Sequence, residues 1–176
     1  ETHRISFAEI PLTSNGSIGF QVENAMAAVG AVWALGMDWA IIRRALQTFV
    51  SDAQTAPGRF NVFSCRGATV IADYGHNPDA IHALVSATGS MPAKRRVVVI
   101  SGAGDRRDVD IRRQTEILGD AFDEAILYED QCQRGRADGE VIALLREGLT
   151  QAKRVSAVRE VRGEFTAIDV ALESLA

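Results

Sequence analysis

Polar residues suited to binding an anionic ligand follow an apolar run in residues 70–79. Asp73 comes directly after this run, where its carboxylate could accept hydrogen bonds from ribose hydroxyls. Pro78 is typical of the first turn of a helix, and the free N–H groups of that turn, beside His76 and Asn77, could bind phosphate. The alternative is that Asp73 and Asn77 only cap the turn and the helix, which turn chemistry alone would explain.

A second candidate is the loop of residues 102–108, which follows the most apolar stretch of the chain, residues 96–101. Its small residues would let the backbone approach a ligand, and its arginines would bind an anion. The loop lacks the third glycine of a GxGxxG motif, and the chain has no GxxxxGK[ST] motif. The alternative is a flexible turn with solvated charges in which Asp108 caps the next helix; the spacing alone does not decide between them.

Two adjacent carboxylates, Glu129 and Asp130, form a third candidate, because they also follow an apolar run. They could bind a cationic group. Arg134 and Arg136, close behind them, could bind a carboxylate. The alternative is a surface loop whose charges neutralise one another.

The composition is that of a soluble globular chain. Of 176 residues, 47% are hydrophobic and 24% are charged, and the net charge is -4. No apolar run approaches the ~20 residues of a membrane span. We therefore expect a cytoplasmic protein without a nucleic-acid or membrane partner. Cys65 and Cys132 have no metal-ligand spacing and are expected to be reduced, partly buried thiols.

Hydrophobic periodicity and turn residues predict an α/β fold. Strands that alternate with helices indicate a Rossmann-like, doubly wound and mostly parallel sheet, preceded by a strand and two helices. Ligands of such sheets bind beyond the carboxyl ends of the strands, where the three candidate sites fall. Both ends of the chain fall within predicted elements, so we expect a piece of a longer protein. The expected helices cover residues 21–35, 39–49, 78–89, 109–121, 139–149 and 165–175, and the expected strands cover residues 5–10, 60–64, 68–72, 96–101, 124–128 and 155–158.

Four motifs, taken in order, resemble those of the Mur ligase superfamily: residues 23–28 (ENAMAA), 57–60 (PGRF), 73–78 (DYGHNP) and 104–108 (GDRRD). The superfamily comprises ATP-dependent amide ligases, among them the ligases of cell-wall precursors, folylpolyglutamate synthetases and cyanophycin synthetases. The versions in this chain are most similar to cyanophycin synthetases, above all residues 104–108 together with the Arg-Gly-Arg that begins at Arg134.

The resemblance implies two domains. Residues 1–56 would be the end of the central, ATP-binding domain, and residues 57–176 would be the C-terminal Rossmann-like domain, truncated before its final strand. In the family's reaction ATP phosphorylates a carboxylate, and an amine then attacks the acyl phosphate to leave an amide, ADP and phosphate. For a cyanophycin synthetase, the amine would be that of arginine and the carboxylate that of an aspartate side chain.

The resemblance also implies two groups of site residues. Asn24 would face adenine, and Arg59 and Asp73 would bind the ribose and the phosphates. The full ATP-binding group would be Asn24, Arg59, Asp73, Tyr74, His76 and Asn77. The group on the side of the incoming amino acid would be Gly104, Asp105, Arg106, Arg107, Glu129 and Asp130.

No catalytic residue is assigned within this chain, because the phosphate-binding loop, its lysine and the Mg²⁺ ligands are expected outside it. We therefore expect the full-length enzyme to use ATP and Mg²⁺, and the isolated chain to be inactive and to bind ATP weakly. The family favours a homo-oligomer that acts on an amino acid or a peptide polymer. The alternatives are a peptidoglycan Mur ligase, a folylpolyglutamate synthetase-like domain and a nucleotide-binding module without catalysis.

Overall fold

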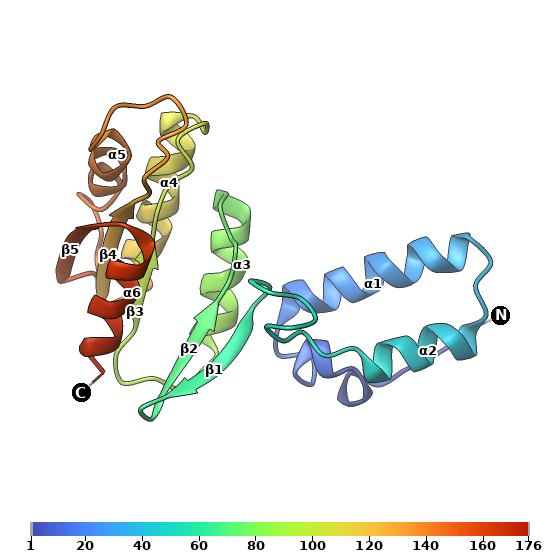
Figure 1. Cartoon of the computed structure of the whole chain (residues 1–176). Helices are drawn as coiled ribbons and strands as arrows, with labels where there is room; N and C mark the ends of the chain where they lie inside the picture. Colours follow the sequence, from blue (N-terminus) through green and yellow to red (C-terminus); the bar gives the residue numbers. More distant parts are fainter. Residues whose placement is uncertain (1, 176) are drawn as a thin grey trace. The chain divides into compact units, whose positions relative to one another are not determined.

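The structure is a computed structural model that describes residues 2–175. Contacts between Cα atoms divide the chain into two compact units. The first extends to Cys65 and includes Thr69–Tyr74, and the second holds Arg66–Ala68 and the described residues from Gly75 onward. The elements, labelled in Figure 1, are the 3-10 helices Phe7–Glu9 and Pro11–Thr13, α1 (Gly19–Ala34), α2 (Trp39–Thr48), β1 (Asn61–Cys65), β2 (Ala68–Ala72), α3 (Pro78–Gly89), β3 (Val97–Ile100), α4 (Asp108–Gly119), β4 (Glu124–Glu129), α5 (Glu140–Gly148), β5 (Ala157–Arg162) and α6 (Glu164–Glu173).

All six predicted helices are present, because their end signals are local. Gly36 has a φ of +79°, which a glycine adopts without strain, and it follows the end of α1. The N–H of Met37 donates to the carbonyl of Val32 at 3.1 Å, which closes the last turn. Asp38 then caps α2, since its carboxylate accepts a hydrogen bond from the N–H of Ala40 at 2.8 Å.

The predicted opening strand, residues 5–10, is wrong. Residues 7–9 form a 3-10 helix instead, and a second 3-10 helix, Pro11–Thr13, follows. The hydroxyl of Ser6 accepts from the N–H of Ala8 at 3.3 Å, and the carboxylate of Glu9 accepts from the N–H of Ser6 at 3.2 Å. These local bonds offer the backbone an alternative to a strand ladder, and Pro11 then starts the second turn.

The alternative in which Asp108 caps α4 does not hold. Asp108 is the first helical residue, and Arg107 precedes it with an extended backbone and no side-chain capping bond. The carboxylate of Asp108 instead accepts a hydrogen bond from the guanidinium of Arg136 at 2.8 Å. A partner distant in sequence has therefore changed the role of a residue whose type favours a cap.

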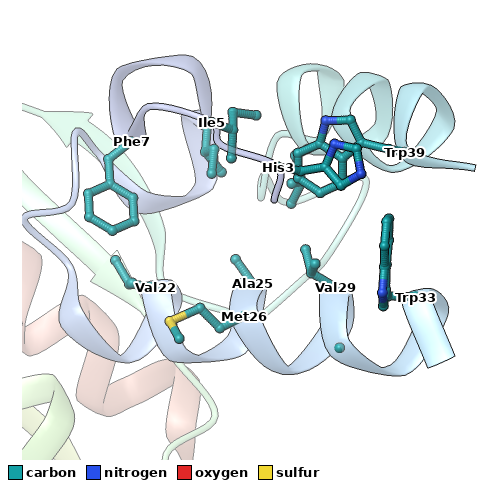
Figure 2. A pocket seen from close by; sticks show the side chains of 12 residues that line it. His3, Ile5, Phe7, Val22, Ala25, Met26, Val29, Trp33 and Trp39 are labelled. Carbon is teal, nitrogen blue, oxygen red and sulfur yellow. The ribbon is translucent and has the colours of Figure 1, made fainter. Parts of the chain in front are cut away.

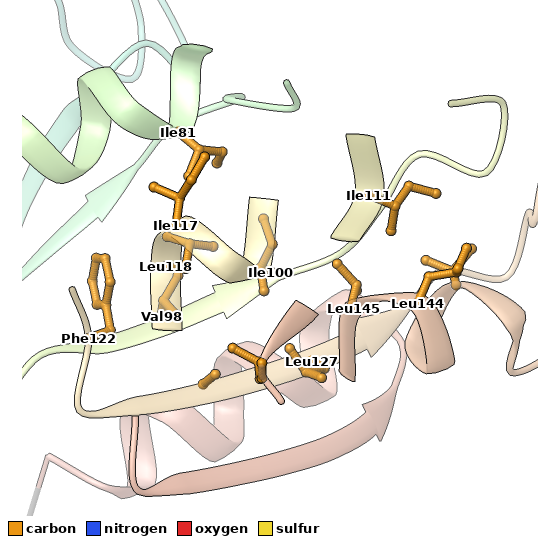
Figure 3. Packing of buried hydrophobic residues seen from close by; sticks show 13 residues of the cluster. Ile81, Val98, Ile100, Ile111, Ile117, Leu118, Phe122, Leu127, Leu144 and Leu145 are labelled. Atoms are coloured by element: carbon orange, nitrogen blue, oxygen red, sulfur yellow. The ribbon is translucent and has the colours of Figure 1, made fainter. Parts of the chain in front are cut away.

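The second unit is built on a parallel sheet in the order β3-β4-β5. Its register pairs Val98 with Ala125 and Ile100 with Leu127, so these four side chains share one face. They pack with α3, α4 and α5 into one hydrophobic cluster (Figure 3). The fully buried Ile126 alternates with them and points to the opposite face, which α6 contacts. Helices on both faces confirm the predicted doubly wound α/β fold.

The strands β1 and β2 form a separate two-stranded sheet rather than part of the parallel one. They are joined by Arg66 and Gly67, whose φ angles are +49° and +78°. Two successive positive φ values are typical of the tight turns that fit the twist of a hairpin. The turn falls between the two strands predicted for residues 60–64 and 68–72.

The first unit contains little buried apolar surface. Most side chains of α1 are exposed, and Met26, at 66% exposure, lines an open apolar groove of about 410 Å³. Figure 2 shows His3 beside Trp39, with Trp33 across from them. The His3 and Trp39 rings are stacked with centroids 4.8 Å apart.

Both cysteines are free thiols. Cys132 is exposed rather than partly buried as predicted.

Candidate functional site

Two of the predicted ATP-binding residues, Asp73 and Tyr74, directly follow β2 and form hydrogen bonds with the turn of residues 57–60. The carboxylate of Asp73 accepts a hydrogen bond from the N–H of Phe60 at 2.9 Å, and Phe60 has a positive φ of +53°. The N–H of Tyr74 donates to the carbonyl of Gly58 at 2.8 Å. Asp73 therefore stabilises a left-handed backbone at a buried phenylalanine, a conformation that would otherwise be costly.

Arg59, on the same turn, lies beside Tyr74. Its guanidinium carbon is 5.8 Å from the centroid of the tyrosine ring, within the range of a cation–π contact. Both side chains are exposed. The turn thus presents a cation and an aromatic face together, a pairing suited to a ligand that carries phosphates and a planar ring.

Asn61 is part of this turn, and the sequence did not single it out. Its side chain is buried, accepts from the N–H of Gly58 at 2.7 Å and donates to the carbonyl of Ala56 at 3.1 Å. Both ends of the amide are therefore used to hold the turn in one shape. The sequence signal that could have identified Asn61 is its position directly after the Pro-Gly-Arg-Phe motif.

Asn24 lies in the same unit, on an exposed position of α1. Its side-chain amide donates to the side-chain oxygen of Gln21 at 3.1 Å. The other two predicted ATP-binding residues, His76 and Asn77, belong to the second unit. Asn77 caps α3, since its side-chain oxygen accepts from the N–H of Ala80 at 2.9 Å. The capping role considered as the alternative for Asn77 is therefore present.

The loops after β3 and β4 lie against each other in the second unit. Gly104 is buried, and a Cβ atom built on it would lie 2.1 Å from the carbonyl oxygen of Gln133. Only glycine permits so close a backbone approach. The parallel pairing of β3 with β4 brings these two loops to the same edge of the sheet.

Arg136 connects the two loops. Its guanidinium donates to the carbonyls of Gly104 at 2.7 Å and Arg106 at 2.6 Å. It also donates to the carboxylates of Asp108 at 2.8 Å and Glu140 at 2.5 Å. Those two carboxylates, Asp108 first, raise the pKa of Arg136 above its ordinary value. Its charge is therefore compensated from within the protein.

Glu129, predicted to contact the amino-acid substrate, is buried beneath the start of α5. Its carboxylate accepts from the N–H of Gly139 at 2.7 Å and from that of Val141 at 3.3 Å. A carboxylate at a helix N-terminus satisfies free N–H groups and interacts favourably with the helix dipole. In this structure Glu129 fixes the beginning of α5.

The other charged residues of these loops are exposed. Asp105 pairs with Arg134 at 3.2 Å, with both side chains about half exposed. Arg107 makes two hydrogen bonds to Asp110, at 2.8 and 2.9 Å, which raise the pKa of Arg107 and lower that of Asp110. The side chain of Arg106 forms no ion pair within residues 2–175. It is the cation of the loop that remains available to a ligand.

Tyr128 and Asp130 lie on the same edge of the sheet, at the end of β4. Burial raises the pKa of the Tyr128 phenol to about 12, and the carboxylates of Glu164 and Asp130 add to this effect. The exposed carboxylate of Asp130 accepts a hydrogen bond from the N–H of Gln131 at 2.7 Å. The edge therefore carries an excess of negative charge near Tyr128.

Within the part of the chain that the structure describes, no three His, Cys, Asp or Glu side chains are grouped as a metal site requires. In the same range, residues 2–175, no helix is long and apolar enough to cross a membrane.

Comparison with known proteins identifies sequence relatives. The family model described as "Mur ligase, glutamate ligase domain" matches residues 58–176. A cyanophycin synthetase of Trichormus variabilis is 35% identical over 173 residues, which are 98% of this chain and 19% of the relative. A UDP-N-acetylmuramoyl-L-alanyl-D-glutamate--2,6-diaminopimelate ligase of Xanthomonas oryzae is 28% identical over 162 residues, 87% of this chain and 32% of the relative. The chain thus spans about a fifth of the length of the cyanophycin synthetase.

Solved structures agree on the fold. A UDP-N-acetylmuramoyl-L-alanyl-D-glutamate--2,6-diaminopimelate ligase superposes with a TM-score of 0.57 at 23% identity, covering 86% of this chain and 30% of the other. A folylpolyglutamate synthase of Thermotoga maritima gives a TM-score of 0.50 at 19% identity, covering 89% and 38%. At such identities the likeness concerns the fold alone.

Proposed function

This chain belongs to the Mur ligase family, matched through its glutamate ligase domain, and from that premise we propose that it is the C-terminal part of an ATP-dependent, ADP-forming amide ligase similar to cyanophycin synthetase. Residues 1–56 would complete the central ATP-binding domain, and residues 57–176 would form the C-terminal domain. The start of the family match at residue 58 supports this division.

The observation that carries the proposal is the meeting of two charged loops at the carboxyl ends of β3 and β4. The close approach of Gly104 to Gln133 keeps these loops together, and Asp105, Arg106 and Asp130 are exposed on them. Arginine, the proposed substrate, carries a guanidinium that would pair with Asp105 or Asp130. Its carboxylate would pair with Arg106.

The amino-acid side would then have two kinds of residue. Asp105, Arg106 and Asp130 would touch the substrate. Gly104 would act through the fit between the loops, and Glu129 through the start of α5, because both oxygens of its carboxylate already accept backbone hydrogen bonds. Arg107 would stabilise the loop through Asp110.

On the ATP side, Arg59 and Tyr74 would contact the phosphates and the nucleoside, and Asp73 would bind the ribose while it holds Phe60. Asn24 would belong to the same group in the first unit, and His76 and Asn77 stay predictions from the resemblance. The γ-phosphoryl group of ATP passes to a carboxylate oxygen and ADP leaves; the amine then forms the amide as phosphate leaves. Exclusion of water protects the acyl phosphate from hydrolysis. No step is assigned to Mg²⁺ through residues of this chain.

The experiment is a phosphate-release assay of the full-length protein with ATP, Mg²⁺, an aspartate polymer and arginine. We expect release that requires both the polymer and arginine, with arginine recovered in the polymer. Release with UDP-N-acetylmuramoyl-L-alanyl-D-glutamate and diaminopimelate, or with a folate and glutamate, would assign the chain to another branch of the family. Absence of ATP turnover with every pair would favour a non-catalytic module.

Two variants test the two groups of residues in the same assay. Asp130→Asn should raise the KM for arginine about tenfold, because one charged contact to a guanidinium is lost, and leave the KM for ATP unchanged. Asp73→Ala should raise the KM for ATP and leave that for arginine unchanged. An unchanged KM for ATP in Asp73→Ala would remove Asp73 from the ATP pocket.

A further inference from the structure

The guanidinium of Arg136 is almost fully occupied. An arginine has five N–H donors, and four of them bind the two carbonyls and two carboxylates described above. Its side chain is only 14% exposed. An incoming anion would find one free donor, so the bidentate pairing that makes arginine an anion ligand is not available.

The four acceptors belong to three different segments. Gly104 and Arg106 supply backbone carbonyls of the β3–α4 loop, Asp108 begins α4, and Glu140 begins α5. Arg136 itself lies in the β4–α5 loop. One side chain therefore fastens two loops and two helix starts to one another.

Two further contacts stabilise the same arrangement. Gly104 lies against the carbonyl of Gln133, and that carbonyl also accepts the backbone N–H of Arg136 at 3.2 Å. Glu129 closes the β4–α5 loop through the N–H of Gly139. The β3–α4 loop therefore rests on a loop that is itself fixed at both ends.

Arg134, two residues earlier, is the contrasting case. Its guanidinium faces Asp105 at 3.2 Å, and both side chains are about half exposed. The β4–α5 loop therefore carries Arg134 at the surface and Arg136 in the contact between the two loops.

We propose that Arg136 is a positioning residue for amino-acid binding: its guanidinium holds the β3–α4 loop on the β4–α5 loop, so that Arg106 and Asp105 project from a fixed backbone beside Asp130. Arg136 does not touch the substrate. The identity of the substrate rests on the proposed function. The four hydrogen bonds by which Arg136 joins the two loops, which we call the clamp, do not depend on it. A displacement of about 1 Å at such contacts is enough to lower the rate a hundredfold.

Arg136→Lys separates this role from direct binding of an anion. Lysine keeps the charge but has no planar fork, so it cannot span the carbonyls of Gly104 and Arg106 together with the carboxylates. In the full-length enzyme we expect Arg136→Lys and Arg136→Gln both to raise the KM for arginine at least ~10-fold, with the KM for ATP unchanged. A wild-type KM for arginine in Arg136→Lys overturns the clamp.

The matched control is Arg113→Gln. Arg113 is an exposed arginine of α4, paired with Glu116 one turn away at 2.8 Å. Its loss removes one positive charge from the same region without touching either loop, and both KM values should be unchanged. An effect of Arg113→Gln equal to that of Arg136→Gln would assign the change to net charge and overturn the clamp.

Amide hydrogen exchange of the full-length protein tests the clamp without any substrate. In Arg136→Gln the amides of residues 103–107 should exchange at least ~10-fold faster, while those of β4 keep their rate. Unchanged exchange in residues 103–107 overturns the proposal. If the wild-type enzyme does not ligate arginine, the proposed function fails, and this measurement still decides whether the clamp exists.

Asp108→Ala provides a milder perturbation if Arg136→Gln does not fold. It removes one acceptor and leaves the bonds of Arg136 to the carbonyls of Gly104 and Arg106. We expect exchange in residues 103–107 between that of the wild type and that of Arg136→Lys. Exchange in residues 103–107 that equals the wild-type rate in both Asp108→Ala and Arg136→Lys would contradict the clamp.

Discussion

Thirteen hydrophobic side chains form one buried cluster in the second unit, on a face of the parallel sheet covered by α3, α4 and α5. In the first unit α1 is richer in apolar residues than α3, α4 or α5, yet only Gln21 and Ala25 of that helix are buried. The difference lies in the partner surface: a sheet face accepts the whole apolar stripe of a helix, whereas α1 contacts α2, the 3-10 helix Pro11–Thr13 and, through Phe20, the ring of Phe60. Burial, rather than apolar content, therefore distinguishes the two units.

The largest expected effect comes from truncating a core side chain in each unit. Leu145→Ala, at a fully buried position of α5, should lower the free energy of unfolding by about 3–4 kcal/mol, because it leaves a cavity in a continuous core. Ile42→Ala in α2 should cost about 2 kcal/mol, since its sparser surroundings can relax.

The two transitions can be followed separately in urea. Both tryptophans, Trp33 and Trp39, lie in the first unit, so fluorescence reports on it, while circular dichroism reports on both units. Leu145→Ala should shift the dichroism midpoint more than the fluorescence midpoint. Equal shifts of both midpoints would mean that the units unfold together and that the contrast between them does not hold for stability.

Two helical glycines give the next largest effect, and in opposite directions. A Cβ atom at Gly148 in α5 would lie 2.2 Å from the carbonyl oxygen of Arg112 and 2.2 Å from the hydroxyl of Thr115. Gly148→Ala must therefore separate α4 from α5, at a cost of about 2 kcal/mol.

Gly30 in α1 is the matched position in the first unit. Apart from its chain neighbours and the backbone of its own helix, no atom of residues 2–175 lies within 4 Å of the Cβ that an alanine would add there. Gly30→Ala should raise the stability of the first unit by about 0.5–1 kcal/mol, because alanine favours the helix. Thermal unfolding with both probes measures the pair, and a loss of stability in Gly30→Ala would contradict the open environment of α1.

A smaller effect concerns pH and the second unit. Asp123 accepts two hydrogen bonds from Arg154 and one from the N–H of Arg96, which lower its pKa from the ordinary value of 3.8. Because the folded pKa is below the unfolded one, this stabilisation is present above about pH 4 and is lost as the pH falls through the folded pKa.

Asp123→Asn tests this contribution. At pH 7 the variant should be about 1 kcal/mol less stable than the wild type, and the difference should shrink on acidification as the wild type loses the same contribution. Asp169→Asn, at an exposed carboxylate of α6, is the control and should change nothing. The checking measurement is urea unfolding by circular dichroism between pH 7 and about pH 3. A constant difference across that range would contradict the role of the Asp123 carboxylate.

The smallest effect is the titration of a phenol. Tyr128 and Tyr74 are the only tyrosines of the chain, one in each unit. Tyr128→Phe should remove a phenolate transition with a midpoint at about pH 12, followed by absorbance. Since this pKa is raised in the folded state, the second unit should begin to lose stability as the pH rises above the ordinary tyrosine value of about 10.

Much of the fold could be predicted because its signals are local. The Gly36 stop, the Asp38 cap and the Pro78 start each act within one turn of a helix, and the buried strand β3 is a short apolar run. The failure at residues 5–10 has the same origin, since an alternation of two or three residues does not distinguish a strand from a capped turn. Ser6 and Glu9 decided that segment through hydrogen bonds that alternation does not encode.

The candidate site divides in the same way. The sequence by itself determined that charged loops follow β3 and β4, because strand ends, glycines and arginines are visible as residue types. Only the tertiary structure decided that Glu129 serves the start of α5, that Arg136 is enclosed by four acceptors, and that Arg106 remains exposed. The physical reason is that both partners of Glu129 and two of the four partners of Arg136 are backbone groups, which every residue carries. Which of those groups come within reach depends on the parallel pairing of strands distant in the chain, and no local pattern of side chains records that.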